Sequence, residues 1–245
     1  MSGPRRDGVD GHVPGTGPWL VFMRWEDLLF LHWRVPIEAL RPLIPDAFDI
    51  ETFDGSAWLG VVPFRMAHVH PRFLPPVGIV SDFAEINVRT YVRFGGRPGV
   101  WFLSLDADDR LACALGRNAF RLPYRRAVMS AEEGSDGWID YRSDRVGRVA
   151  AGFRGRFRPR SDGPAPADEL TDWLTVRDGL WTVDRQGRPL WAGIRHPAWP
   201  LQAAEAEISD ISLVAADGVS VEGPPVHMAF SRALDVVGWR PVRLG

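Results

Sequence analysis

The sequence FAEINVRTYVRF at residues 83–94 predicts a β-strand with two chemically different faces. Successive residues of a strand point to opposite sides of a sheet. The even positions carry alanine, isoleucine, valine, threonine and phenylalanine, whereas Glu85, Asn87, Arg89, Tyr91 and Arg93 occupy most of the odd ones. The polar face is either a surface in contact with water or the wall of a pocket.

More strands are expected on either side of this one. The glycine-rich residues 95–99 predict a turn that pairs residues 83–94 with residues 100–105 as an antiparallel hairpin. Short helices are expected after Pro36, after Asp108 or Asp109, and over residues 168–176. The remaining predicted strands are 19–33, 48–53, 56–68, 127–131, 138–142, 146–158, 180–184, 189–194, 203–213 and 226–232. Many short strands with few short helices predict a mainly β protein, a closed or nearly closed antiparallel β-barrel.

The chain is expected to form one domain. Residues 1–18 are rich in glycine, proline and arginine and predict a disordered or variable tail, followed by a single domain over residues 19–245. The Pro/Gly/Ala segment at residues 161–167 is too short to separate two cores. No stretch reaches the roughly 18 uninterrupted apolar residues of a membrane span, so no contact with a membrane is expected.

The charged residues exclude several classes of function. The net charge of -2 over 245 residues provides no field that would attract nucleic acid. All 29 basic residues are arginines, so a lysine Schiff base is excluded. The single Cys113 stands among small apolar residues and predicts a buried side chain rather than a nucleophile. One cysteine also fits the reducing cytoplasm, which is the expected location.

Three blocks of the sequence resemble a known family. They are WLGVVPFRM at residues 58–66, EINVRTYV at 85–92 with GVWFLSLDA at 99–107, and HPAWPL at 196–201. In order and spacing they resemble the YqjF-like family of DUF2071 proteins, which is functionally uncharacterised. The chain is more remotely similar to acetoacetate decarboxylase, and this resemblance implies a cone-shaped antiparallel β-barrel with the active site inside.

The resemblance to the decarboxylase breaks at one position. In that enzyme a Gly-Arg pair is followed, six residues beyond the arginine, by Pro-Lys-Lys, and the first lysine forms the Schiff base. Here Gly116-Arg117 is followed at the same spacing by Pro123, Tyr124 and Arg125. A tyrosine therefore stands at the position of the nucleophile, and decarboxylation through an imine is not available to this chain.

If the resemblance holds, the odd face of residues 83–94 lines an internal pocket. Glu85 matches an active-site glutamate of the decarboxylase-like proteins and would exchange protons together with Tyr124. The predicted substrate contacts, chosen for their polar or charged side chains, are Asn87, Arg89, Arg117, Arg125 and His196. The alternative is structural: Glu85 forms an ion pair with Arg89 or Arg117, the other arginines hold strands together, Tyr124 packs at the rim and His196 caps a turn.

The spacing of two histidines is compatible with a metal site. His68 and His70 share one face of a predicted strand, and His32 or His196 would supply a third ligand. No acidic ligand is near in sequence and the resemblance implies no metal, so neither a metal nor a cofactor is expected.

Two classes of function remain. The first is an enzyme that acts on a small carbonyl or carboxylate compound by acid/base chemistry without a Schiff base. The second is a non-catalytic protein that binds or senses a small molecule in the same pocket, and a purely structural role ranks third. In both leading cases the partner is a small, anionic molecule, and the oligomeric state, a homo-oligomer included, is left open.

Overall fold

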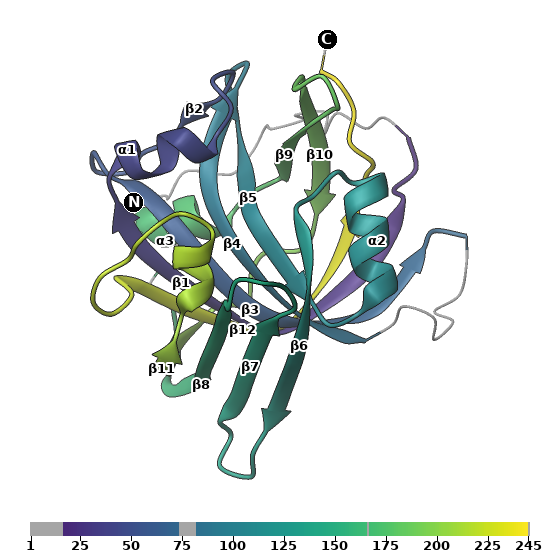
Figure 1. Ribbon diagram of the computed structural model, residues 1–245. Coiled ribbons are helices and arrows are strands. Elements are labelled where there is room, and N and C mark those ends of the chain that lie inside the picture. The colour runs from purple at the N-terminus through teal and green to yellow at the C-terminus, as the bar shows by residue number, and fades with distance from the viewer. Residues whose placement is uncertain (1–16, 74–81, 166, 245) are drawn as a thin grey trace, which may run out of the picture.

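One β-sheet forms most of the computed structural model, which describes residues 17–73, 82–165 and 167–244 (Figure 1). The strands are β1 (Val21–Val35), β2 (Asp49–Ile50), β3 (Ala57–Pro71), β4 (Phe83–Phe94), β5 (Arg97–Ala107), β6 (Tyr124–Glu133), β7 (Ile139–Arg145), β8 (Gly152–Pro164), β9 (Gly179–Val183), β10 (Pro189–Arg195), β11 (Gln202–Asp210) and β12 (His227–Gly238). The helices are α1 (Ile37–Leu40), η1 (Arg41–Leu43), α2 (Arg110–Ala119), α3 (Glu169–Thr175) and α4 (Ser212–Ala216). The tail expected at residues 1–18 lies almost wholly outside the described residues, as does most of the proline-rich loop expected after His70.

The sheet is nearly closed into a ring. Its strand order is β10-β9-β5-β6-β7-β8-β11-β12-β1-β3-β4-β2, and additional pairings join β5 to β4 and β10 to β12. These two pairings return the sheet onto itself, with α2 and α3 to either side in Figure 1. The prediction of a mainly β chain with few short helices is confirmed.

The sheet departs from the expected antiparallel arrangement at β5. This strand runs parallel to β6, with Leu105 opposite Tyr124, and parallel to β9, with Val100 opposite Leu180. Parallel neighbours require a crossover connection rather than a tight turn, and α2 supplies one between β5 and β6. The parallel pairing of β5 could not be predicted from turn residues, because these residues indicate only antiparallel hairpins.

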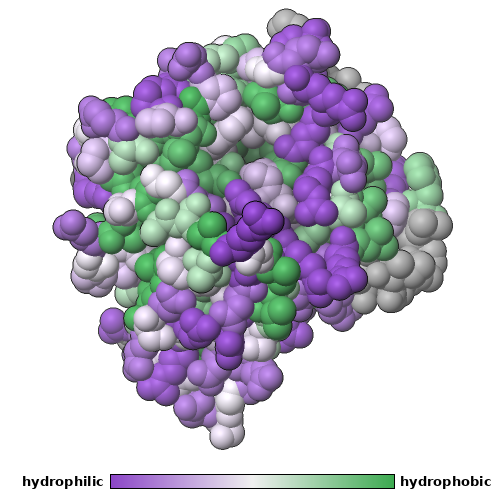
Figure 2. All heavy atoms as spheres, in the orientation of Figure 1, coloured by the Kyte–Doolittle hydropathy of each residue, from purple (hydrophilic) through white to green (hydrophobic). Residues whose placement is uncertain are grey.

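Both faces of β4 are buried. Most even side chains belong to the largest apolar core, together with residues of β1, β3, β8 and β12, whereas the odd residues from Phe83 to Arg89 line a cavity. The members of β4 in that core are Ala84, Ile86, Val88 and Val92. Figure 2 shows the complementary outer surface, where hydrophilic residues cover much of the visible face and apolar residues gather between them. The central strand is therefore covered on one side by a packed core and on the other by a pocket.

Local signals placed some element boundaries well and others poorly. Asp109 caps α2, because its side chain accepts a hydrogen bond from the backbone N–H of Ala112 at 2.6 Å. The strand expected at residues 203–213 instead ends at Asp210, whose carboxylate accepts from the backbone N–H of Ser212 at 2.9 Å, and α4 follows. The strand expected at residues 146–158 begins later, at Gly152, and continues into the predicted linker.

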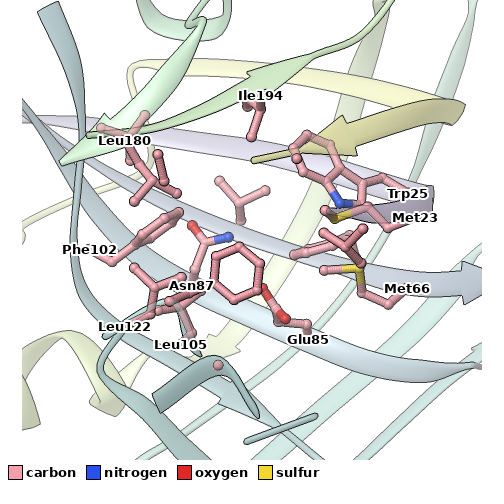
Figure 3. A pocket seen from close by; sticks show the side chains of 18 of the residues that line it. Met23, Trp25, Met66, Glu85, Asn87, Phe102, Leu105, Leu122, Leu180 and Ile194 are labelled. Carbon is pink, nitrogen blue, oxygen red and sulfur yellow. The ribbon is translucent and has the colours of Figure 1, made fainter. Parts of the chain in front are cut away.

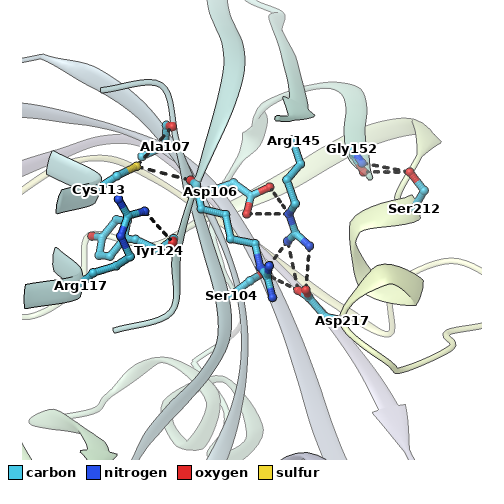
Figure 4. Close-up of polar contacts among 11 residues, drawn as sticks. Ser104, Asp106, Ala107, Cys113, Arg117, Tyr124, Arg145, Gly152, Ser212 and Asp217 are labelled. Atoms are coloured by element: carbon cyan, nitrogen blue, oxygen red, sulfur yellow. Dashed lines mark hydrogen bonds and ion pairs between the residues drawn. The ribbon is translucent and has the colours of Figure 1, made fainter. Parts of the chain in front are cut away.

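A buried ionic cluster ties β5, β7 and the end of α4 together (Figure 4). Arg145 Nε donates to both carboxylate oxygens of Asp106 at 3.0 and 2.9 Å, and Arg145 Nη1 donates to Asp217 at 2.8 Å. Arg145 Nη2 donates to Ser104 Oγ at 2.8 Å, and the Ser104 hydroxyl also donates to Asp217. Because these carboxylates are buried, their charges depend on Arg145 for compensation.

We expect R145Q to lower the free energy of unfolding by about 3 kcal/mol, because it leaves two buried carboxylates without their cation. Urea denaturation at pH 7 measures this. The matched control is R142Q on the same strand, where Arg142 is exposed beside Asp144 at 2.6 Å and is expected to contribute less than about 1 kcal/mol. Equal losses in the two variants would contradict a structural role for the cluster.

Candidate functional site

A cavity of about 210 Å³ lies against the odd face of β4 (Figure 3). Its wall is mainly apolar and is built by β1, β3, β5, α2, β9 and β10 as well as β4. Apolar members of the wall include Met23, Trp25, Phe64, Met66, Phe102, Leu105, Leu122, Leu180 and Ile194. Its polar members are Glu85, Asn87, Arg89, Tyr124, Thr175, Arg177 and His196. Apolar walls with a few polar groups are typical of small-molecule sites.

Three polar side chains line the cavity in a row along β4. Glu85, Asn87 and Arg89 occupy alternate positions of one strand, so their Cα atoms are spaced by about 6.6 Å. The structure thus places these residues as the alternation predicts. Figure 3 shows Glu85 and Asn87 among the apolar side chains of the wall. The row runs from a carboxyl group through an amide to a guanidinium group.

Glu85 and Tyr124 are in direct contact. The Tyr124 hydroxyl donates to Glu85 Oε2 at 2.8 Å, and the Glu85 side chain is buried. Burial raises the pKa of Glu85 from 4.5 to about 8, although the hydrogen bond from Tyr124 lowers it in part. Burial also raises the pKa of Tyr124 well above its usual value of 10. Both groups therefore carry protons at neutral pH, and Glu85 titrates close enough to neutrality to give or accept one.

Neighbouring residues hold this pair in place. Gly116 of α2 lies against the Tyr124 ring, and a Cβ at that position would overlap the ring. The hydroxyl of Tyr141 lies within hydrogen-bond distance of the carbonyl oxygens of Glu85 and Phe64, at 2.7 and 3.1 Å. These contacts fix the Tyr124 ring and the backbone at Glu85, and the sequence alone did not point to Tyr141.

A second arginine, Arg177, lines the cavity near Arg89. The guanidinium carbons of Arg177 and Arg89 lie 4.6 and 5.8 Å from the ring centroid of Tyr91. Arg177 Nη1 donates to Glu51 Oε2 at 2.6 Å. Sequence reasoning missed Arg177, because it follows a predicted helix in a segment whose direction no local pattern reveals.

Two expected substrate contacts lie elsewhere. Arg117 is exposed, donates from Nη1 to the carbonyl oxygen of Tyr124 at 3.2 Å, and lines a separate hollow of about 520 Å³. Arg125 is exposed, because alternation along β6 sends its side chain away from the side that Tyr124 faces. The expectation that Arg117 and Arg125 reach the cavity of Glu85 is therefore not met.

His196 reaches the edge of the cavity. Its ring packs against Trp199 and Trp25 with centroid distances of 4.9 and 6.4 Å, and its Nδ1 lies 2.7 Å from the carbonyl oxygen of Pro197. Burial lowers the pKa of His196, so the ring is neutral at pH 7. This histidine offers a hydrogen-bonding group rather than a positive charge.

His68 and His70 do not form a metal site with a third ligand in the described part of the chain. His70 stacks on Phe22 at 5.0 Å between ring centroids, and His68 is exposed. Over residues 17–73, 82–165 and 167–244 no group of three or more His, Cys, Asp and Glu side chains could hold a metal ion. Cys113 is buried, and burial raises the pKa of its thiol. None of the helices that the structure describes is long and apolar enough to cross a membrane.

The ring of strands around an apolar cavity defines an acetoacetate decarboxylase-like fold. Acetoacetate decarboxylase from Legionella pneumophila matches with a TM-score of 0.63 and 13% identity, over 100% of this chain and 98% of that one. The enduracididine biosynthesis enzyme MppR complexed with pyruvate matches with a TM-score of 0.55 and 13% identity, over 98% of this chain and 95% of that one. At such identities the likeness shows the fold alone.

The chain belongs to the DUF2071 family, described as an uncharacterized conserved protein, whose model matches residues 22–235. The uncharacterized protein YqjF of Bacillus subtilis (strain 168) is 39% identical over 228 residues, which is 93% of each chain. The resemblance drawn from the three sequence blocks is thereby confirmed.

We expect the stability of E85Q relative to the wild type to rise between pH 5 and 8.5. The native protein binds more protons than the unfolded chain between the ordinary pKa of 4.5 and the folded pKa of about 8, so the wild type loses stability as the pH rises through this window. The loss amounts to at most a few kcal/mol. Urea denaturation of both proteins across this range measures it. E132Q, at an exposed position of β6, is the control, and a flat difference between E85Q and the wild type would show that Glu85 is ionised throughout.

We expect G116A to disturb Tyr124 specifically, because the added methyl group overlaps the phenol ring. The overlap forces the ring or α2 to move, which costs about 1–3 kcal/mol of stability and weakens the 2.8 Å bond to Glu85. The double variant G116A/Y124L provides the measurement, since a smaller side chain should relieve the overlap. If G116A and G116A/Y124L are destabilised equally relative to their Gly116 parents, the packing argument fails.

Proposed function

We propose that the cavity binds a small carbonyl or carboxylate compound and that Glu85 and Tyr124 perform acid/base chemistry on it. The observation that carries the proposal is the 2.8 Å hydrogen bond between Tyr124 and Glu85 in an apolar cavity, where burial raises the pKa of Glu85 to about 8. A carboxyl group with such a pKa is suited to proton transfer at neutral pH. Arg89, Asn87 and His196 supply the polar contacts that orient the ligand.

The simplest reaction that these groups support is enolisation. In the fraction of molecules in which Glu85 is ionised, the C–H bond next to a carbonyl breaks, its proton passes to the Glu85 carboxylate, and the electron pair of that bond moves to the carbonyl oxygen. The Tyr124 hydroxyl, which donates to Glu85 in the free protein, then turns its O–H bond to that oxygen as its negative charge develops. The reverse step returns the proton, so the reaction needs no further reactant. Because the 29 basic residues are all arginines, no imine with a lysine takes part.

The comparisons support small oxo acids as the first compounds to test. A structure of similar fold, MppR, is described as complexed with pyruvate, and this motivates the choice of probe without assigning that ligand to the present chain. The expected cytoplasmic location and single domain remain predictions.

The second candidate is a non-catalytic protein that captures a small molecule in the same cavity. The mainly apolar wall favours this candidate, because burial of apolar ligand surface stabilises a complex without any catalytic group. Proton exchange separates the two candidates, because only the enzyme accelerates it.

We expect the wild type to exchange the hydrogens next to the carbonyl of an oxo acid for deuterium in D₂O, as followed by proton NMR. The probes are pyruvate, 2-oxobutanoate, 4-methyl-2-oxopentanoate and phenylpyruvate. E85Q should exchange about 100-fold more slowly, and Y124F should also be slower because it loses the oxyanion donor. E132Q is the control.

Saturation-transfer NMR with the same four probes reports binding independently of exchange. Binding with exchange no faster than in E85Q would favour the non-catalytic candidate. Failure of all four probes to bind would contradict the proposed ligand class.

A further inference from the structure

We propose that Arg177, together with Arg89, forms a carboxylate-binding subsite at the end of the cavity away from Glu85. The subsite selects monocarboxylates whose apolar chain extends along the cavity toward Tyr124. This inference rests on the proposed function, because it concerns the same cavity and names the class of ligand that the cavity takes.

The free edge of the Arg177 guanidinium is the first argument. Nη1 of Arg177 is bound to Glu51, whereas Nε and Nη2 are buried without a hydrogen-bond partner in the described part of the chain. Nε and Nη2 point their N–H bonds in parallel from one edge, which is the geometry that receives both oxygens of a carboxylate. A buried donor without a partner is costly, and Arg177 is only 8% exposed while lining the cavity. A bound carboxylate would satisfy both donors at once.

The balance of charge is the second argument. Arg177 shares Glu51 with Arg93, which donates to the other carboxylate oxygen at 2.5 Å, so one acidic side chain serves two arginines. Arg89 adds a third positive charge near Arg177, and its Nε is buried without a partner among the described residues. An anion at this end would relieve the repulsion between the two guanidinium groups of the cavity.

The histidines next to this end of the cavity are neutral, so they neither add to nor cancel the positive charge of the arginines. His32 Nε2 lies 2.8 Å from Tyr91 Oη, and His32 Nδ1 lies 3.0 Å from His227 Nδ1. Burial lowers the pKa of His227 to about 4 and that of His32 well below 6.5, so both rings are neutral at pH 7. The arginines are therefore the cations that an incoming carboxylate meets here.

Distances along β4 set the length of the ligand. Arg89 and Glu85 are four residues apart on one strand, so their Cα atoms are separated by about 13 Å. Asn87 lies between them, and its Oδ1 is buried without a partner in the described structure, free to accept from a hydroxyl or N–H group on the chain. A two-carbon acid would contact only the arginine end. An acid of about six carbons reaches from the arginines toward Glu85 and fills the apolar section.

Isothermal titration with hexanoate and hexanamide tests the subsite, because these probes share shape and differ in charge. The wild type should bind hexanoate at least about tenfold more tightly than hexanamide, the ratio expected for charge-assisted hydrogen bonds, and more tightly than acetate. R177Q should reduce the hexanoate-to-hexanamide ratio to about one while leaving hexanamide binding unchanged. R177K keeps the positive charge beside Glu51 but loses the parallel donors, so it should give an intermediate hexanoate-to-hexanamide ratio. R177K provides the test if R177Q does not fold.

R93Q is the matched control, because Arg93 binds the same Glu51 but lies outside the cavity wall. R93Q should keep the wild-type ratio. Equal binding of hexanoate and hexanamide by the wild type, or an unchanged ratio in R177Q or R177K, overturns the subsite. Comparison of binding and exchange in the wild type distinguishes the subsite from the proposed function. A preference for hexanoate without deuterium exchange contradicts the acid/base proposal alone. Deuterium exchange without a preference for hexanoate contradicts the subsite alone.

Discussion

Burial of both faces of β4 is the constraint on which the rest of the structure depends. The even face is apolar and packs into the main core without difficulty. The odd face carries Glu85, Asn87 and Arg89, and polar groups of this kind are costly to bury unless they are paired or neutralised. Glu85 meets this demand through protonation and the hydrogen bond from Tyr124. Arg89 is only partly compensated, because its Nε is buried without a hydrogen-bond partner in the described structure. The cavity beside it has room for a ligand that could accept this hydrogen bond.

The position of Tyr124 shows how one side chain changes the chemistry that a fold can support. By the sequence resemblance, acetoacetate decarboxylase has its lysine nucleophile at this position. Tyr124 supplies a hydroxyl proton donor at the same place but no amine. Gly116 leaves space for the larger ring, so the tyrosine is accommodated by its neighbour on α2. The result is an acid pair in an apolar setting rather than a covalent site.

Local chemistry accounts for the parts of the site that were predicted. Alternation along one strand is a geometric rule, and it therefore placed Glu85, Asn87 and Arg89 on one face. Asp109 was predicted as a helix cap because a cap requires only contacts three residues away. Arg117 was misplaced because its direction depends on how α2 lies against the sheet. Arg125 was misplaced because the predicted strand began only at residue 127, so the alternation that opposes Arg125 to Tyr124 was not foreseen. Arg177 was missed because its contacts with Glu51 and Tyr91 join segments far apart in the chain.

The sequence by itself therefore determined that the chain is mainly β, that one strand face is polar, and that no lysine is available for an imine. Each of these follows from residue types and short spacings. Only the tertiary structure decided that the polar face lines a cavity, that Tyr124 donates to Glu85, and that Arg177 rather than Arg117 joins Arg89 there. These facts depend on the near closure of the sheet, including the parallel pairing of β5 with β6, and long-range pairing of that kind leaves no mark on neighbouring residues.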